Sequence, residues 1–289
     1  MARTRVRTRT RTRVRGRGSL PVTSTALVLS LSALLALTAT ACGSDQDDDG
    51  ADGKGGKDGK GKGGPTVVAT TTWEGALAKA AGARDVKVIV PSSAQHAPDY
   101  EPKPSDLAAV AGADFVLYAP FEPYAEQIKE AAGSDAKLVQ VGLDNDANKT
   151  RAEVTRLGRE FGTEDAAAKW NTSFAGTYAA LQKDLKSAWP DGKPPAVVAQ
   201  VFSTWSAKMA GADLRGRYGP GSVTAGQLAE LSAKKPVLVL DNAHMTTGEV
   251  LPDTDARQVE IVNYPDKNLD LVAVYRDAAK TIKDAMASS

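Results

Sequence analysis

Residues 86–118, VKVIVPSSAQHAPDYEPKPSDLAAVAGADFVLY, decide the fold of this chain. The apolar run 86–90 predicts a buried strand, and a polar loop that contains His96 follows it. A helix is expected to begin at Ser105, and the run 115–118 predicts a second buried strand. Ligands bind outside the carboxyl ends of the strands in open α/β sheets, so we expect the His96 loop to form the floor of a binding site.

The same alternation of short apolar runs and amphipathic segments continues through the rest of the chain. Strands are predicted at 67–70, 86–90, 115–118, 138–141, 196–202, 237–240 and 259–262, and helices at 74–81, 105–111, 123–132, 151–188, 228–234 and 268–286. Strands that alternate with helices favour parallel sheets. The segment 151–188 lacks proline and keeps apolar residues at helical spacing, which predicts either a surface helix or a rigid helix that links two lobes.

We therefore predict an α/β protein with two lobes of parallel sheet flanked by helices. One long linking helix joins the lobes, and the ligand cleft lies between them. The expected boundaries are 66–145 for the first lobe, 146–190 for the linking helix and 191–289 for the second lobe.

The segment before residue 66 has the features of a targeting signal and a tether. Eight arginines among residues 2–18 precede an apolar run, and small residues lead to Cys42. This order is typical of a secretory signal at 1–41. Cys42 is the only cysteine, so an intrachain disulfide is impossible, and we predict that it is lipidated. Residues 43–65 consist mainly of Gly, Asp and Lys and contain no large apolar residue. Residues 42–65 are therefore expected to be a disordered tether that carries the lipid anchor.

Net charge changes when the predicted signal is removed. The whole chain has 36 basic and 35 acidic residues, and removing residues 1–41 takes away eight arginines and no acid. The remaining 28 basic residues face 35 acidic ones, a net charge of −7. An acidic body argues against a nucleic-acid partner.

Six loops follow predicted strands and are expected to converge on the cleft. They lie at 71–73, around His96, at 121–122, at 144–146, at 203–205 and at 241–244. Both histidines of the chain, His96 and His244, belong to this set. With Asp241 and one of Asp99, Glu101 or Glu122, they would supply the imidazole and carboxylate ligands that suit zinc or manganese. The alternative is that His96 is a solvated loop residue and His244 caps a local turn.

Aromatic residues near the same loops indicate a second kind of site. Trp73, Phe121, Tyr124, Phe202 and Trp205 are candidates to line an apolar cleft with a few polar groups, such as Glu122, as pockets for organic solutes do. The alternative is that these side chains belong to the core, and for Phe202 we expect the core.

Catalysis is not predicted, and no catalytic cofactor is expected. From residue 66 onward, the sequence has no Gly-x-Ser-x-Gly elbow, phosphate-binding loop, His-Glu-x-x-His or Gly-x-Gly-x-x-Gly motif. A hydrolase needs a nucleophile near a base, and Ser203 with His244 is the only pair whose loop positions suit that role.

The central stretch resembles a known family. Val90-Pro91, His96, the run YEPKPSDL at 100–107 and the run AGAD at 111–114 are similar to the metal-binding (zinc/manganese type) solute-binding proteins of bacterial ABC transporters. The resemblance implies a solute-binding lipoprotein at the outer face of the cell membrane. It also implies an ABC permease as partner, and zinc or manganese as the transported ligand. We expect the protein to be a monomer.

The ligand positions of that family are only partly matched. Its first metal-binding histidine corresponds to Pro98, its second would fall near 144–150, its third would fall near Gln200, and Asp241 matches its acidic ligand. We therefore assign His96, His244, Asp241 and Glu101 as the metal-site residues and Trp73, Glu122 and Trp205 as ligand-binding residues. The alternatives left open are a metal chelate or small organic solute as ligand, or an adhesive lipoprotein without transport.

Overall fold

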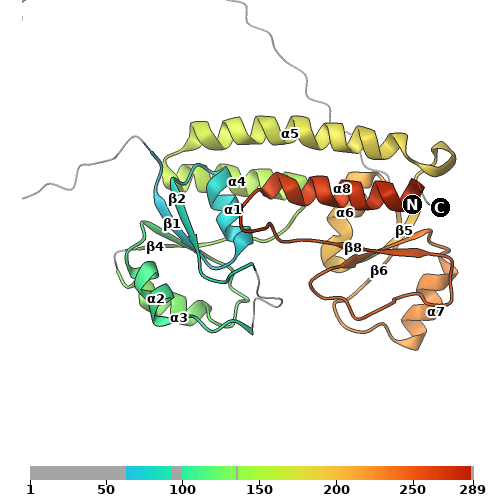
Figure 1. The fold of residues 1–289 in the computed structure, drawn as a ribbon, viewed down its shortest axis with the longest axis horizontal. Coiled ribbons are helices and arrows are strands. Elements are labelled where there is room, and N and C mark those ends of the chain that lie inside the picture. Colours follow the sequence, from blue (N-terminus) through green and yellow to red (C-terminus); the bar gives the residue numbers. More distant parts are fainter. Residues whose placement is uncertain (1–62, 93–98, 135, 288–289) are drawn as a thin grey trace, which may run out of the picture. The chain divides into compact units, whose positions relative to one another are not determined.

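The computed structural model describes residues 63–92, 99–134 and 136–287. The predicted signal, the predicted lipidation site Cys42, most of the tether and His96 lie outside the described residues. The described residues form two sheets, with helices between and around them (Figure 1).

Each half of the described chain forms a four-stranded sheet in which every pairing is parallel. The first sheet contains β1 (Thr66–Ala69), β2 (Asp85–Val88), β3 (Phe115–Tyr118) and β4 (Lys137–Gln140). The second contains β5 (Ala196–Gln200), β6 (Asp213–Tyr218), β7 (Leu238–Asn242) and β8 (Arg257–Ile261). The strand orders are β2-β1-β3-β4 and β6-β5-β7-β8, so the two sheets share one topology. The predicted α/β fold is confirmed.

The connections between parallel strands are mostly helical. The helices are α1 (Thr72–Ala80), α2 (Pro104–Ala111), α3 (Ala125–Ala132), α4 (Ala147–Phe161), α5 (Glu164–Ser187), α6 (Thr204–Ala210), α7 (Ala225–Ala233) and α8 (Leu271–Ala287). Local capping explains several starts. Thr71 and Glu74 form a capping box at α1, Thr224 and Gln227 form another at α7, and the Asp146 carboxylate accepts the first backbone amides of α4.

One long helix, α5, links the two halves as predicted, and a separate helix, α4, precedes it. Helix α4 ends at Phe161, and Gly162 adopts a left-handed conformation with φ of 67°. Glycine takes this conformation without steric cost and is a common helix terminator. The 24-residue α5 then leads from the first half of the chain to the second.

Two elements of the second sheet are absent from the elements predicted by sequence. Helix α6 is only seven residues long. Strand β6 has the sequence DLRGRY, in which the two arginines leave no apolar run that would predict a strand. The predicted strand 196–202 ends at Gln200, and Val201–Ser203 form a short 3₁₀ turn. Phe202 is therefore 54% exposed, which corrects its expected place in the core.

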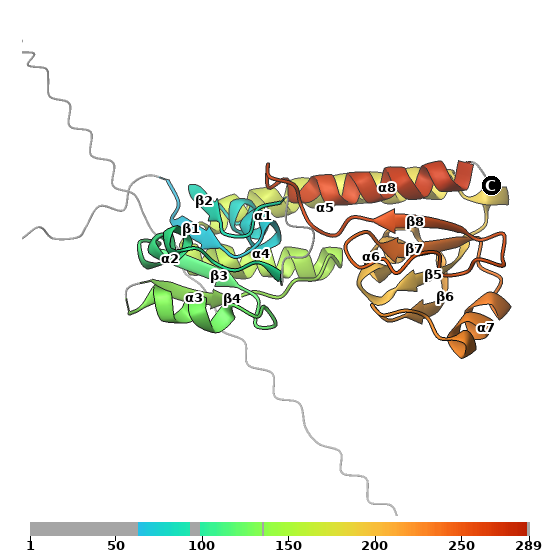
Figure 2. The ribbon, with the colours of Figure 1, turned by 60° about the horizontal axis from the view of Figure 1, so that its bottom comes forward.

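A continuous apolar core connects the helices with both sheets. Tyr275 of α8 is its largest fully buried side chain. Its ring packs against Phe174 and Tyr178 of α5 and Trp205 of α6, with ring centroids 4.8, 5.9 and 5.1 Å away. Figures 1 and 2 both show α8 running alongside α5.

Across the described ranges, we find no helix with the length and apolar character that a membrane crossing requires.

Candidate functional site

The shared topology marks one position in each sheet where a ligand is expected. In a sheet of order β2-β1-β3-β4, the connections from the two central strands leave toward opposite sides, and a crevice opens outside their carboxyl ends. In the first sheet this switch point lies after β1 and β3. In the second sheet it lies after β5 and β7.

Two buried glutamates occupy the switch point of the first sheet. Glu74 follows β1 and is fully buried, while Glu122 follows β3 and is 5% exposed. One Glu74 oxygen, Oε2, accepts hydrogen bonds from the Thr71 backbone amide (3.1 Å) and the Thr71 hydroxyl. Glu122 Oε2 accepts from the Ala119 amide (3.0 Å), and its Oε1 accepts from the Tyr124 hydroxyl (3.3 Å).

The ionisation of these glutamates is coupled to their burial. Burial, followed by the charge of Glu74, raises the pKa of Glu122 to about 8. Burial also raises the pKa of Glu74, against the opposing effect of the Thr71 hydroxyl. Removing a carboxylate from water disfavours its charged form, and a second carboxylate nearby disfavours it further. At neutral pH, the pair therefore keeps a proton.

The switch point of the second sheet holds a buried acid of a different kind. Asp241, in β7, is 1% exposed. Its Oδ1 accepts a hydrogen bond from the Tyr218 hydroxyl at 2.8 Å, and its Oδ2 accepts from Gln258 Nε2 at 3.3 Å. The Ser203 hydroxyl donates to the Asp241 backbone carbonyl at 3.1 Å, which ties the end of β5 to β7. Both carboxylate oxygens are thus already used.

His244 lies two residues after β7 and presents an uncharged ring. Its backbone amide donates to Asn242 Oδ1 at 3.0 Å, and its ring meets Tyr264 edge to face at 4.9 Å. Burial lowers the pKa of His244, so its imidazole is neutral at neutral pH. Its Nε2 is buried and has no hydrogen-bond partner among the described residues. A neutral imidazole with a free ring nitrogen is the form that binds a metal.

Tyr264, between β8 and α8, connects residues from both halves of the chain. Besides His244, it packs edge to face against Trp73 of α1 at 5.2 Å. The adjacent Asn263 accepts a 2.7 Å hydrogen bond from Trp205 Nε1, and its backbone carbonyl accepts one of 2.9 Å from Asn145. We call these six residues the seam: Trp73, Asn145, Trp205, His244, Asn263 and Tyr264.

Buried polar atoms without partners gather where strands end. Among the described residues, seven buried side-chain atoms have no hydrogen-bond partner. Six of them belong to residues at or shortly after the carboxyl end of a strand, namely Thr70 Oγ1, Glu74 Oε1, Asn145 Oδ1, Gln200 Nε2, His244 Nε2 and Asn263 Nδ2. An unsatisfied buried polar group costs free energy, so such groups mark places where water or a ligand supplies the missing partner.

The predicted metal ligands are not brought together as one set. His96 lies outside the described residues, and Glu101 is exposed. Within the ranges that the structure covers, no three His, Cys, Asp or Glu side chains gather closely enough to hold a metal ion. The described member of the set with a free donor atom is His244.

The predicted aromatic lining divides into buried and exposed residues. Trp73, Tyr124 and Trp205 are buried, whereas Phe121 is 64% exposed. Among the described residues, five of the seven exposed large apolar side chains lie within three residues after a strand end: Phe121, Val201, Phe202, Met245 and Val262. We call these five residues the apolar rim.

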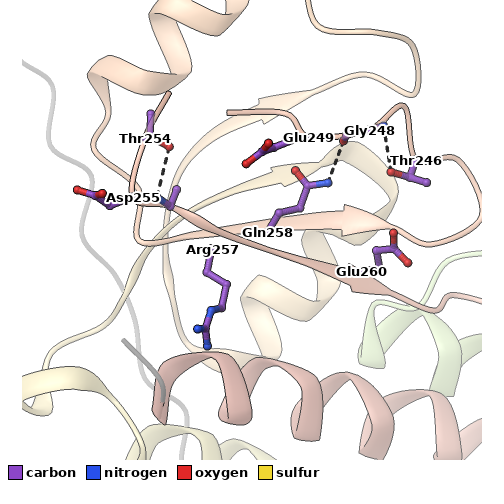
Figure 3. A pocket seen from close by; sticks show the side chains of 9 residues that line it. Thr246, Gly248, Glu249, Thr254, Asp255, Arg257, Gln258 and Glu260 are labelled. Carbon is purple, nitrogen blue, oxygen red and sulfur yellow. Dashed lines mark hydrogen bonds between the residues drawn. The ribbon is translucent and has the colours of Figure 1, made fainter. Parts of the chain in front are cut away.

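A separate hollow of about 730 Å³ lies beside the edge strand β8. Figure 3 shows Gln258 in this hollow, with its amide directed toward the Gly248 carbonyl, and the carboxylates of Glu249 and Glu260 nearby. None of the residues that line it belongs to the seam. We therefore place the candidate site at the seam rather than in this open hollow.

Glu74, Asn263 and Tyr264 are site residues that the sequence alone does not reveal. In the sequence, Glu74 is only the start of a predicted helix, and 263–264 fall in a connection between predicted elements. One available signal is the spacing of Thr71 and Glu74, which is that of a capping box, but this pattern does not show that the carboxylate is buried. The hypothetical pair of Ser203 and His244 is not formed, because Ser203 binds Asp241 and His244 packs on Tyr264.

Comparison with known proteins agrees with the fold described above. Residues 67–196 match the family described as the periplasmic component A of the zinc-uptake complex, ZnuA. No curated protein sequence matches the chain.

Solved structures share the fold at low sequence identity. A zinc-bound deletion mutant of ZnuA has a TM-score of 0.58 at 17% identity, covering 76% of this chain and 97% of its own. The laminin-binding protein Lmb of Streptococcus agalactiae, described as an adhesin with metal-transporting activity, has a TM-score of 0.56 at 14% identity, with 78% and 99% covered. The periplasmic heme-binding protein BhuT has a TM-score of 0.53 at 18% identity, with 77% and 99% covered.

The family match covers the first sheet and the linking helices, and the shared fold extends over both sheets. Residues 67–196 of this chain are thus similar to the ZnuA family, and the chain shares the fold of solved ZnuA structures.

Proposed function

We propose that this chain captures a divalent metal, zinc or manganese, at the seam and delivers it to an ABC permease. The observation that carries this proposal is His244. Its imidazole is neutral, its Nε2 is buried without a partner among the described residues, and its ring packs on Tyr264, which also contacts Trp73. Zinc and manganese both accept imidazole nitrogen, and the further ligands would come from His96 and solvent.

Delivery to a permease requires that the protein be held near the membrane. We propose that Cys42 is lipidated and that residues 43–65 tether the folded part to the outer face of the cytoplasmic membrane. The sequence supports this with the arginine-rich, apolar and small-residue order of residues 1–41.

A calorimetric titration of the chelator-treated protein with zinc and with manganese tests the metal proposal. One-to-one binding that is weakened about tenfold or more in both His96→Ala and His244→Ala is expected, because each change removes one ligand. Ser173→Ala, on α5, serves as the matched control. Binding that survives both histidine substitutions would contradict the proposed site, and absence of binding by either metal would contradict a free ion as the cargo.

A metal chelate is the second candidate cargo, and the apolar rim favours it. Binding of a bare ion buries no apolar surface. A chelate with apolar ring faces would bury the exposed phenylalanines, and this burial stabilises the complex. BhuT, which shares the fold, is described as binding heme.

Hemin is a suitable probe for this second candidate, because its absorbance changes when an imidazole binds its iron. Phe121→Ser and Phe202→Ser are expected to weaken hemin binding, while Val237→Ser is not. Val237 is also exposed, at 41%, but it precedes β7 and so lies at the opposite end of the strand from the rim. Equal effects of all three substitutions would exclude the rim as a binding surface.

A further inference from the structure

The two switch-point glutamates of the first sheet form a second polar centre, which the proposed transport site does not use. Neighbouring strands bring them together, because β1 pairs with β3 and each glutamate follows one of these strands. The Thr70 amide donates to the Leu117 carbonyl at 3.0 Å, which extends the pairing beyond the end of β1 toward Glu122.

In each carboxylate, one oxygen accepts a hydrogen bond from a backbone amide, and the other has a weak hydrogen bond or none. The Oε2 atoms accept from backbone amides, of Thr71 for Glu74 and of Ala119 for Glu122. Glu74 Oε1 has no partner among the described residues, and Glu122 Oε1 has only the 3.3 Å contact from Tyr124.

A third buried oxygen, the Thr70 hydroxyl, lies near the two carboxyl groups. Thr70 is fully buried, and its Oγ1 has no hydrogen-bond partner within the described part of the chain. It is nevertheless close to both carboxylates, because the Thr70 hydroxyl is among the groups that oppose the burial-driven rise in the pKa of Glu74 and of Glu122. Three buried oxygens thus lie near one another, and two of them, Thr70 Oγ1 and Glu74 Oε1, have no hydrogen-bond partner among the described residues.

The charge balance of this centre is incomplete. The groups that act most strongly on the two carboxyls are hydroxyls, backbone amides and the other carboxyl, and none of these is a cation. Two buried carboxylates without a positive neighbour are strongly unfavourable, and a bound cation removes the penalty. Oxygen-only donor sets prefer hard cations over zinc.

We propose that Glu74, Glu122 and the Thr70 hydroxyl form a buried site for one hard divalent cation of the Ca²⁺ or Mg²⁺ class. This site is separate from His244. It adjoins the seam through Tyr264, whose pKa burial raises to about 12, with further contributions from Glu74 and Glu122. An ion here stabilises the ends of β1 and β3 against which the seam is built.

Thermal unfolding of the chelator-treated protein at pH 8.5, with CaCl₂ and separately with MgCl₂, tests this site. The midpoint is expected to rise in a saturable way with at least one of the two ions. Equilibrium dialysis with the same ion should give one equivalent bound. Glu122→Gln is expected to weaken binding about tenfold or more, because its amide oxygen still accepts from Ala119 but supplies no charge.

Two control variants separate this site from a general effect of surface charge and from the transport site. Glu126→Gln, an exposed acid on α3 paired with Lys129, should bind the ion as the unaltered protein does. His244→Ala should also retain it, so failure of the transport proposal and failure of this one are distinguishable.

Three results would overturn the proposal. They are the absence of any Ca²⁺- or Mg²⁺-dependent shift, a shift that Glu122→Gln leaves intact, and a shift that Glu126→Gln removes. The first would show that a proton alone occupies the pair.

Discussion

The buried acids of the two sheets occupy equivalent places in one topology and are treated in opposite ways. Asp241, in the second sheet, has both oxygens bound by the neutral donors Tyr218 and Gln258. Glu74 and Glu122, in the first sheet, lie close enough to repel each other and leave oxygens unsatisfied. A buried acid with all its hydrogen bonds made serves the structure, whereas a pair with free oxygens is prepared for a proton or a cation.

The largest expected effect concerns how the free energy of unfolding of the metal-free protein depends on pH. Because the pKa of Glu122 is raised from 4.5 to about 8 in the folded protein, the folded state holds a proton that the unfolded state releases. The contribution of this group to the free energy of unfolding is therefore fully present below about pH 4.5, and it is lost as pH rises toward 8. The loss amounts to about 5 kcal/mol.

Urea unfolding at a series of pH values from about 5 to 9, which spans the titration of Glu122, measures this loss. Glu122→Gln should flatten the curve, because glutamine does not titrate in this range. A curve that is equally steep in Glu122→Gln would show that the dependence comes from elsewhere in the chain.

The second effect concerns Asp241, where the comparison predicts a structural loss. Asp241→Ala removes the acceptor of the Tyr218 hydroxyl and the Gln258 amide and leaves both donors unpaired. We expect the free energy of unfolding to fall by about 3 kcal/mol at neutral pH. Urea unfolding at neutral pH measures this loss. A loss no larger than that of Glu126→Ala, at an exposed acid, would contradict the structural role of Asp241.

A smaller effect is expected from Trp205→Phe at the seam. This change keeps most of the ring packing against Tyr275 but removes the 2.7 Å hydrogen bond from Trp205 Nε1 to Asn263. The stability should fall by about 1 to 2 kcal/mol, which chemical denaturation can resolve. Trp170→Phe is a matched control, because Trp170 stacks on Phe174 at 4.8 Å and does not belong to the seam. A smaller loss in Trp205→Phe than in this control would contradict the importance of the hydrogen bond.

Most elements of the fold are predictable from the sequence because their patterns are local. The run 115–118 is predicted with its observed bounds, since a short apolar segment between a helix and a polar loop has few other interpretations. Strand β6 is harder to find because arginines alternate along it, and α6 is harder because seven residues carry too little periodicity. The division at Gly162 depends on a backbone conformation that a glycine permits but does not require.

The candidate site is harder to predict from the sequence than the fold is. The places of His244 and Asp241 after a strand single them out, but whether their polar atoms are free depends on Tyr218, Gln258 and Tyr264. These partners come from other strands and loops, at separations that no motif records. Glu74 shows the same limit, because its burial results from packing between α1 and its neighbours in the first sheet.

Crystals of the chelator-treated protein soaked in zinc, with anomalous diffraction at the zinc edge, test most directly whether the seam holds the metal. We expect one strong peak about 2.1 Å from His244 Nε2, next to the ring of Tyr264. A zinc ion found elsewhere, with His244 Nε2 still lacking a ligand, would contradict the proposed capture of metal at the seam.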